Sequence, residues 1–180
     1  MSIGSICGSL KDRLCENSTL KVQHAGGELY MTYFSWRQPA NKDKINTLQE
    51  NSGWRLPRDF IEFLLVSDGA SLFCNKMDES RVELYSVNEI NEYYEDYAKG
   101  DGYLRTYPPE WVMIGEYSGY GEYFFIDSKK VKDGENRCMI NVSVGNIISM
   151  EIDFTTWLDR LIVAQGERFW LWNESKHIDI

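Results

Sequence analysis

The sequence predicts a single α+β domain in which helices pack around an antiparallel mixed sheet. Three observations support this prediction. Apolar side chains recur at helical spacing over residues 56–64, whereas short aromatic-rich runs farther along the chain alternate with turn residues, as strands joined by hairpins do. With 180 residues, of which 43% are apolar, the chain is long and apolar enough for one sizeable core.

The first 40 residues are expected to form an N-terminal extension packed on the domain. Ile6, Leu10 and Leu14 have the spacing of a short helix. The run Glu28–Trp36 is rich in aromatic residues, which favours a strand. The main domain is expected over residues 41–172, and a polar tail over 173–180 follows it.

Two helices are predicted between Asn41 and Gly69. Asn41 can cap the first, which carries Ile45 and Leu48 and ends near Gly53. The second follows after a very short link. The two helices are therefore expected to pack as a corner or a hairpin.

The second of these helices has marked ends. Pro57 suits the first helical position, and Asp59 lies in the first turn, where a carboxylate meets the positive end of the helix dipole. Gly69 is expected to close the helix, because glycine adopts a positive φ at little cost. The apolar stripe of this helix consists of Leu56, Phe60, Phe63 and Leu64.

The hydrophobic period changes after this helix. Ser71–Cys74 and Val82–Tyr85 have the composition of short strands. Ser86 and Glu89 have the spacing of a capping box, which predicts the start of another helix. The buried stripe of that helix is expected to be Val87, Ile90, Tyr94 and Tyr97.

A strand meander and a closing helix are predicted for the rest of the chain. A polar turn is expected over Lys129–Asn136, and Asp153 can cap the last helix, which begins at Phe154. The expected strands are Trp111–Glu116, Glu122–Asp127, Arg137–Val142 and Ile147–Ile152.

The composition excludes several classes of protein. The net charge is −9, which repels phosphate backbones and disfavours direct nucleic-acid binding, whereas a basic partner would be attracted. Neither a secretory signal nor an apolar run long enough to span a membrane is visible. We therefore expect a cytoplasmic protein without disulfides, in which the thiols of Cys7, Cys15, Cys74 and Cys138 are reduced.

The residues that carry common chemistries are sparse. His24 and His177 lie near opposite ends of the chain, and no cysteine pair has the spacing of a zinc site. A Cys–His or Ser–His nucleophile is also disfavoured, because it needs a well-placed histidine and both histidines lie in a turn or a tail. Gly119–Gly121 is followed by a strand pattern, so a hairpin turn is favoured over a phosphate loop. We assign no catalytic residue, metal or cofactor, although a pair of carboxylates in an unrecognised site stays open.

The acidic segment over 78–101 is the most distinctive feature. It holds eight acids against Arg81 and Lys99. On its helix, Glu89, Glu92, Tyr93 and Asp96 are expected on the face opposite the buried stripe, with no basic partner among them. This face is either solvated or a docking surface for a basic protein. The candidate partner-binding residues are Glu92, Tyr93, Glu95, Asp96, Asp101, Tyr103 and Tyr120.

The motifs around the second helix resemble a known signature. Trp54 follows a glycine, Leu56 precedes Pro57, and the helix ends in Asp68 and Gly69. Together with Asp59-Phe60, these residues resemble the SUKH superfamily (SMI/KNR type), which joins fungal cell-wall regulators to bacterial immunity proteins. The resemblance covers roughly residues 41–165 and includes the strand ending at Asp127 and the closing helix.

The resemblance implies a non-enzymatic binding protein of the bacterial immunity branch. Such a protein would neutralise a toxin effector by occluding it, and its partner here would be a basic cognate toxin. A monomer is expected. Two alternatives stay open: a regulatory or scaffold protein of the fungal cell-wall type, and an enzyme with an unrecognised carboxylate site.

Overall fold

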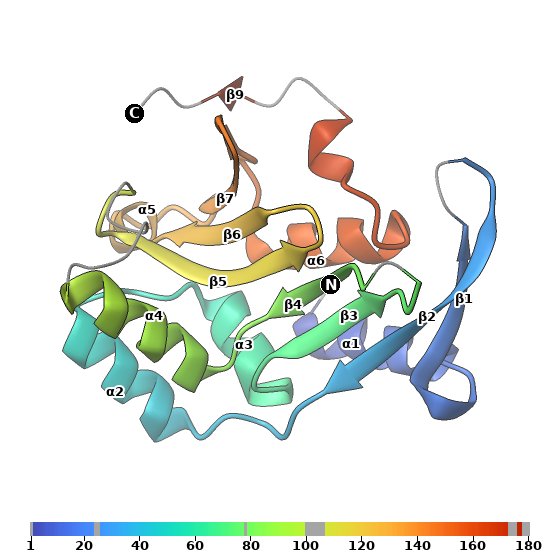
Figure 1. Cartoon of the computed structure of the whole chain (residues 1–180). Helices are drawn as coiled ribbons and strands as arrows, with labels where there is room; N and C mark the ends of the chain where they lie inside the picture. Colours follow the sequence, from blue (N-terminus) through green and yellow to red (C-terminus); the bar gives the residue numbers. More distant parts are fainter. Residues whose placement is uncertain (1, 24–25, 78, 100–106, 173–175, 178–180) are drawn as a thin grey trace.

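The computed structural model describes residues 2–23, 26–77, 79–99, 107–172 and 176–177, which form a single α+β domain (Figure 1). The strands of these residues form one nine-stranded sheet, in which each strand pairs antiparallel with the next strand in the sequence. The predicted fold class is confirmed, and the sheet is antiparallel throughout the described part.

The strands are short and follow the sequence signals closely. β1 was not predicted, although Leu20 and Val22 alternate with polar residues in its sequence, and β9 is a two-residue strand near the end of the chain. The bounds are β1 Thr19–Gln23, β2 Leu29–Trp36, β3 Ala70–Cys74, β4 Arg81–Leu84, β5 Trp111–Ser118, β6 Glu122–Asp127, β7 Met139–Ser143, β8 Asn146–Ser149 and β9 Lys176–His177.

Local capping sets the starts of most helices. Asn41 accepts a hydrogen bond from the backbone N–H of Asp43 at 2.8 Å, and Asp153 accepts one from Thr156 at 2.7 Å, as predicted. The bounds are α1 Ile3–Arg13, α2 Lys42–Ser52, α3 Arg58–Val66, α4 Val87–Lys99, α5 Ser128–Lys132 and α6 Phe154–Val163, with the 3₁₀ turns η1 Glu16–Ser18 and η3 Phe169–Leu171.

Both predicted ends of α3 were wrong by a residue or two. Pro57 is the N-cap with an extended backbone (ψ 151°), and the helix ends at Val66, with Ser67 as its C-cap. Gly69 has a φ of +87°, but its role is close packing at the start of β3. A Cβ there would lie 2.6 Å from the carbonyl oxygen of Leu84 on the neighbouring strand, so only glycine fits.

Two further predictions require correction. The segment expected as a polar turn begins with helix α5, because Asp127 accepts hydrogen bonds from the N–H groups of Lys129 and Lys130 and so caps a helix. Helices α2 and α3 do not pack mainly on each other. α2 lies beside α4, whereas α3 packs against α1 and α6 (Figure 1).

Helices α1, α3 and α6 cover one face of the sheet and form the main core with it; they lie behind the sheet in Figure 1. Phe60 and Phe63 of α3 are fully buried, and their rings lie 5.0 and 5.4 Å from the ring of Phe154 on α6. Trp157 of α6 meets Phe124 of β6 at 4.9 Å. The predicted burial of the α3 stripe is thus confirmed.

Polar contacts join the same elements. Asp59, predicted only as a favourable first-turn acid, also accepts hydrogen bonds from the N–H and hydroxyl of Thr155 on α6, at 2.8 and 3.1 Å. At the other end of the core, Glu122 of β6 is buried and accepts hydrogen bonds from Arg168, Trp170 and Asn141 at 3.0, 2.9 and 3.2 Å. Glu122 thereby anchors the C-terminal segment to the sheet.

The first 40 residues contribute to this core. Ile3, Ile6 and Leu10 of α1 are buried, and α1 packs against α3 and α6. The first two strands extend the sheet beyond β3. This part of the chain therefore shares its hydrophobic core with residues 41–172.

Candidate functional site

Helix α4 is the element that carries most of the predicted site, and its start is held by two sets of hydrogen bonds. The capping box forms as predicted: the N–H of Ser86 donates to Glu89 at 2.7 Å, and the N–H of Glu89 donates to the hydroxyl of Ser86 at 3.2 Å. In addition, the N–H of Val87 donates to the carboxylate of Asp68 at 2.8 Å. The turn between α3 and β3 therefore helps to position α4.

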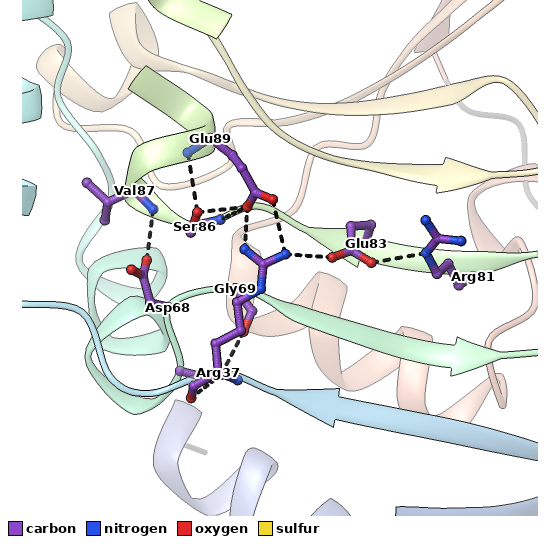
Figure 2. A network of polar contacts seen from close by, with 9 residues as sticks. Arg37, Asp68, Gly69, Arg81, Glu83, Ser86, Val87 and Glu89 are labelled. Carbon is purple, nitrogen blue, oxygen red and sulfur yellow. Dashed lines mark hydrogen bonds and ion pairs between the residues drawn. The ribbon is translucent and has the colours of Figure 1, made fainter. Parts of the chain in front are cut away.

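Arg37 lies at the centre of this polar network (Figure 2). Its guanidinium donates to both carboxylate oxygens of Glu89, with one contact at 3.1 Å, and to Glu83 of β4 at 2.9 Å. Arg81 adds a second cation to Glu83 at 3.2 Å. The backbone N–H of Arg37 donates to Ser67 at 2.9 Å. Arg37, which directly follows β2, thus connects β4, the end of α3 and the start of α4.

Glu89 therefore does not belong to the unpartnered acids that the sequence predicted. Its partner Arg37 lies 52 residues earlier, so no helical spacing could reveal the pair. Burial acts to raise the pKa of Glu89, but the hydrogen bonds from Arg37 and Ser86 outweigh it and lower that pKa. The hydrogen bond to Glu89 in turn raises the pKa of Arg37.

The outer face of α4 retains three acids. Glu92, Glu95 and Asp96 are exposed, and the side chain of Asn91 donates to Glu95 at 2.9 Å. Of the other predicted partner-binding residues, Asp101 and Tyr103 lie outside the described residues, as does the side chain of Tyr97. The described part of the acidic face is thus short and lies on one side of one helix.

The sequence predicted that Tyr93 points freely into solvent, and the structure corrects this prediction. Tyr93 is half-buried, and its ring stacks on Tyr85 at 4.8 Å. Burial raises the pKa of both hydroxyls, and the carboxylate of Glu116 on β5 raises both further. Tyr93 instead forms part of the wall between α4 and the sheet.

Tyr120 lies on a different part of the surface. It occupies the β5–β6 turn, where its ring contacts Tyr117 at 4.7 Å and lies under the Arg168 guanidinium at 4.3 Å. β4 pairs its first residue, Arg81, with the end of β5 beside this turn, whereas α4 begins past the opposite end of β4. The structure therefore separates Tyr120 from the acids of α4.

Beneath α4 the structure forms an aromatic hollow that the sequence interpretation did not identify. Its members come from the α2–α3 link, α4, the segment before β5, and strands β5 and β6. No local signal could have identified it, because burial along β5 does not alternate and a bulge between Met113 and Gly115 changes which side chains share a face. The residues lining the hollow are Trp54, Tyr93, Tyr107, Pro108, Trp111, Met113 and Phe125.

Some chemistries find no support in the described residues. In that part of the chain, no three His, Cys, Asp or Glu side chains converge as metal ligands would, and no helix is long and apolar enough to cross a bilayer. All four cysteines are free thiols. Burial raises the pKa of Cys138 to about 12, which disfavours its reactive thiolate form. His24 lies outside the described residues.

The order of helices and strands, with Asp59 and Gly69 in the roles described above, defines a single-domain α+β protein of the kind that the sequence signature predicts. A family model gives the assignment directly: the SMI1/KNR4 family (SUKH-1) matches residues 39–160. The chain belongs to this family. The matched region begins just after Arg37 and ends within α6.

Two relatives from Bacillus subtilis (strain 168) match over most of their length. The uncharacterized protein YnaB is 29% identical over 140 residues, which cover 76% of this chain and 86% of YnaB. The uncharacterized protein YobM is 27% identical over 172 residues, covering 91% of this chain and 88% of YobM. The match to YobM extends well beyond the family model.

Proposed function

We propose that this protein is an immunity protein that binds a cognate bacterial toxin effector and neutralises it by covering the toxin's active surface. Its membership of the SMI1/KNR4 family supports a binding role. The net charge of −9 supports a basic partner, since a protein of opposite charge is attracted from solution.

The observation that carries this proposal is the exposed acidic face of α4 on a firmly held helix. Glu92, Glu95 and Asp96 face solvent, while the first turn is fixed by the capping box and by Arg37. A helix that is already ordered loses little conformational entropy on binding. Its acids can therefore steer a basic partner and hold it in one orientation.

The proposal is tested by co-expressing the protein with the product of the neighbouring toxin gene. We expect growth to be rescued and a stable complex to be purified. A complex without rescue would indicate a scaffold protein, and the absence of both would contradict the proposal.

The role of α4 is tested by reversing two charges, Glu92→Lys and Asp96→Lys. Association should slow about tenfold or more at low ionic strength, and the difference should shrink as salt is added, because exposed charges are screened. The matched control is Asp12→Lys with Glu62→Lys, which changes the net charge equally through exposed residues of α1 and α3. Equal slowing in both variants would show that only net charge matters.

A further inference from the structure

The aromatic hollow beneath α4 is partly closed and partly open to solvent. Trp54, Met113 and Phe125 form its buried floor and wall. Tyr93, Tyr107 and Trp111 are half-buried at its rim, so solvent reaches them. The indole N–H of Trp54 donates to the carbonyl of Pro109 at 2.8 Å, which fixes the orientation of that ring.

The rings contact one another and hold the shape of the hollow. Tyr107 stacks on Trp111 with centroids 6.2 Å apart, and it meets Phe125 at 5.4 Å. Trp54 meets Tyr94 of α4 edge-on at 5.0 Å. The hollow is therefore formed before any ligand arrives, and aromatic faces make up most of its lining.

Negative charge lies beside these rings. Met113 and Glu116 lie on the same face of β5. Their partners on β6, Phe125 and Tyr123, are two positions apart and therefore share a face, and paired residues of neighbouring strands point to the same side. Glu116 also lies close enough to raise the pKa of Tyr93. On α4, Asp96 lies one helical turn beyond Tyr93. An aromatic lining with carboxylates next to it attracts cations, through the ring quadrupoles and through charge.

The size of the hollow distinguishes between the two cationic groups that a partner protein can offer, the ammonium of lysine and the guanidinium of arginine. The hollow has a volume of about 20 Å³. A cavity of that order holds a single group the size of a water molecule, and an ammonium group is about that size. The planar guanidinium of arginine is larger, and an aliphatic lysine stem suits the apolar rim.

We infer that this hollow is a binding site for a lysine side chain of the partner protein, whose ammonium enters between the rings of Trp54, Tyr93 and Trp111. This inference rests on the proposed function and specifies how the basic partner is recognised. The acids of α4 act at long range and set the rate of encounter. The hollow acts at contact and slows dissociation.

The site is tested on the full-length protein without any partner. The probes are Nα-acetyl-lysine methylamide and the uncharged analogue Nα-acetyl-norleucine methylamide, and the readout is the indole N–H NMR signals of Trp54 and Trp111. We expect both signals to shift on titration and the lysine probe to bind about 5- to 30-fold more tightly. Equal affinity for the two probes would overturn the inference, because the hollow would then be merely apolar.

Two variants and a third probe sharpen the test. Glu116→Gln should reduce the preference for lysine without changing norleucine binding, and Trp111→Leu should weaken lysine binding at least fivefold while Trp172→Leu, at an exposed residue, should not. An arginine probe that binds as tightly as lysine would contradict the choice of ammonium. Shifts confined to α4, with both indole signals unmoved, would contradict the site.

The result is independent of the test of the proposed function. The probes report on the hollow whether or not a toxin partner exists. A lysine site in a protein that rescues no growth would leave this inference standing and overturn the proposed function. Rescue by a protein whose hollow ignores lysine would do the reverse.

Discussion

The two faces of the sheet serve different purposes: one stabilises the fold, and the other presents groups that a partner can contact. The face covered by α1, α3 and α6 buries Phe60, Phe63 and Trp157 completely. Near α4, the other face carries ion pairs and half-buried rings, among them Glu83 and Tyr93. The first arrangement gains its free energy from apolar burial, and the second keeps polar and aromatic groups within reach of a partner.

Acids show the same division. Glu122 on the covered face is buried and accepts hydrogen bonds from three side chains, including the cation Arg168. Glu83 and Glu116 lie opposite each other on the other face, and the structure neutralises Glu83 with Arg37 and Arg81. Acids that are largely buried, such as Glu122 and Glu83, must be satisfied within the fold, whereas the partly exposed Glu116 remains able to meet a ligand.

The strongest way to break this division is to empty the covered face. Phe63→Ala should lower the free energy of unfolding by about 3–5 kcal/mol, because it leaves a cavity among rings that cannot collapse. Urea denaturation measures the change. Leu65→Ala on the same helix is the control, since Leu65 is exposed, and it should cost under about 1 kcal/mol. Similar losses in both variants would contradict the core described here.

The buried acid should matter next. Glu122→Gln keeps the shape of the side chain but removes the charge that Arg168 and Trp170 contact, so we expect a loss of about 1.5–3 kcal/mol. Thermal unfolding measures this loss. A double-mutant cycle with Arg168→Met isolates the ion pair. A coupling energy near zero would mean that Arg168 contributes only through its aliphatic part.

The network on the other face should contribute less, and in a pH-dependent way. Arg37→Ala should cost about 1 kcal/mol at neutral pH, because Arg37 and Glu89 are each 35% exposed, so that solvent screens their ion pair, and because Arg81 still contacts Glu83. The folded state lowers the pKa of Glu89, so its stabilisation is present above the unfolded pKa of about 4.3 and disappears as the pH falls through the folded value.

The difference between wild type and Arg37→Ala should therefore shrink below about pH 4. Denaturation at a series of pH values checks this. Arg81→Ala provides the comparison, since Arg81 contacts Glu83 but not Glu89, and its smaller cost should change little with the protonation of Glu89. A gap that widens in acid would show that Glu89 is not the titrating group.

The smallest effect on stability is expected at the outer face of α4. Glu92→Lys with Asp96→Lys should change the free energy of unfolding by less than about 0.5 kcal/mol, because both side chains are exposed and off the buried stripe. Thermal melts measure this directly. A large loss of stability would mean that this face supports the fold. Slower association of the same variant would then reflect a damaged fold and not the loss of a contact surface.

The sequence by itself determined the elements whose signals are local. Asn41, Ser86 with Glu89, and Asp153 mark helix starts within three or four residues, so capping chemistry alone located α2, α4 and α6. Apolar periodicity likewise identified the buried stripe of α3. Short-range signals are sufficient here, because the interactions that cause them are themselves short-range.

Only the tertiary structure decided what these elements meet. Arg37 reaches Glu89 because β2, β3 and β4 lie side by side in the sheet, and Tyr93 turns inward because Tyr85 lies beneath it. The aromatic hollow brings Trp54 next to Phe125, 71 positions apart in the sequence. Sheet register and helix packing create these neighbours, and neither depends on spacing along the chain.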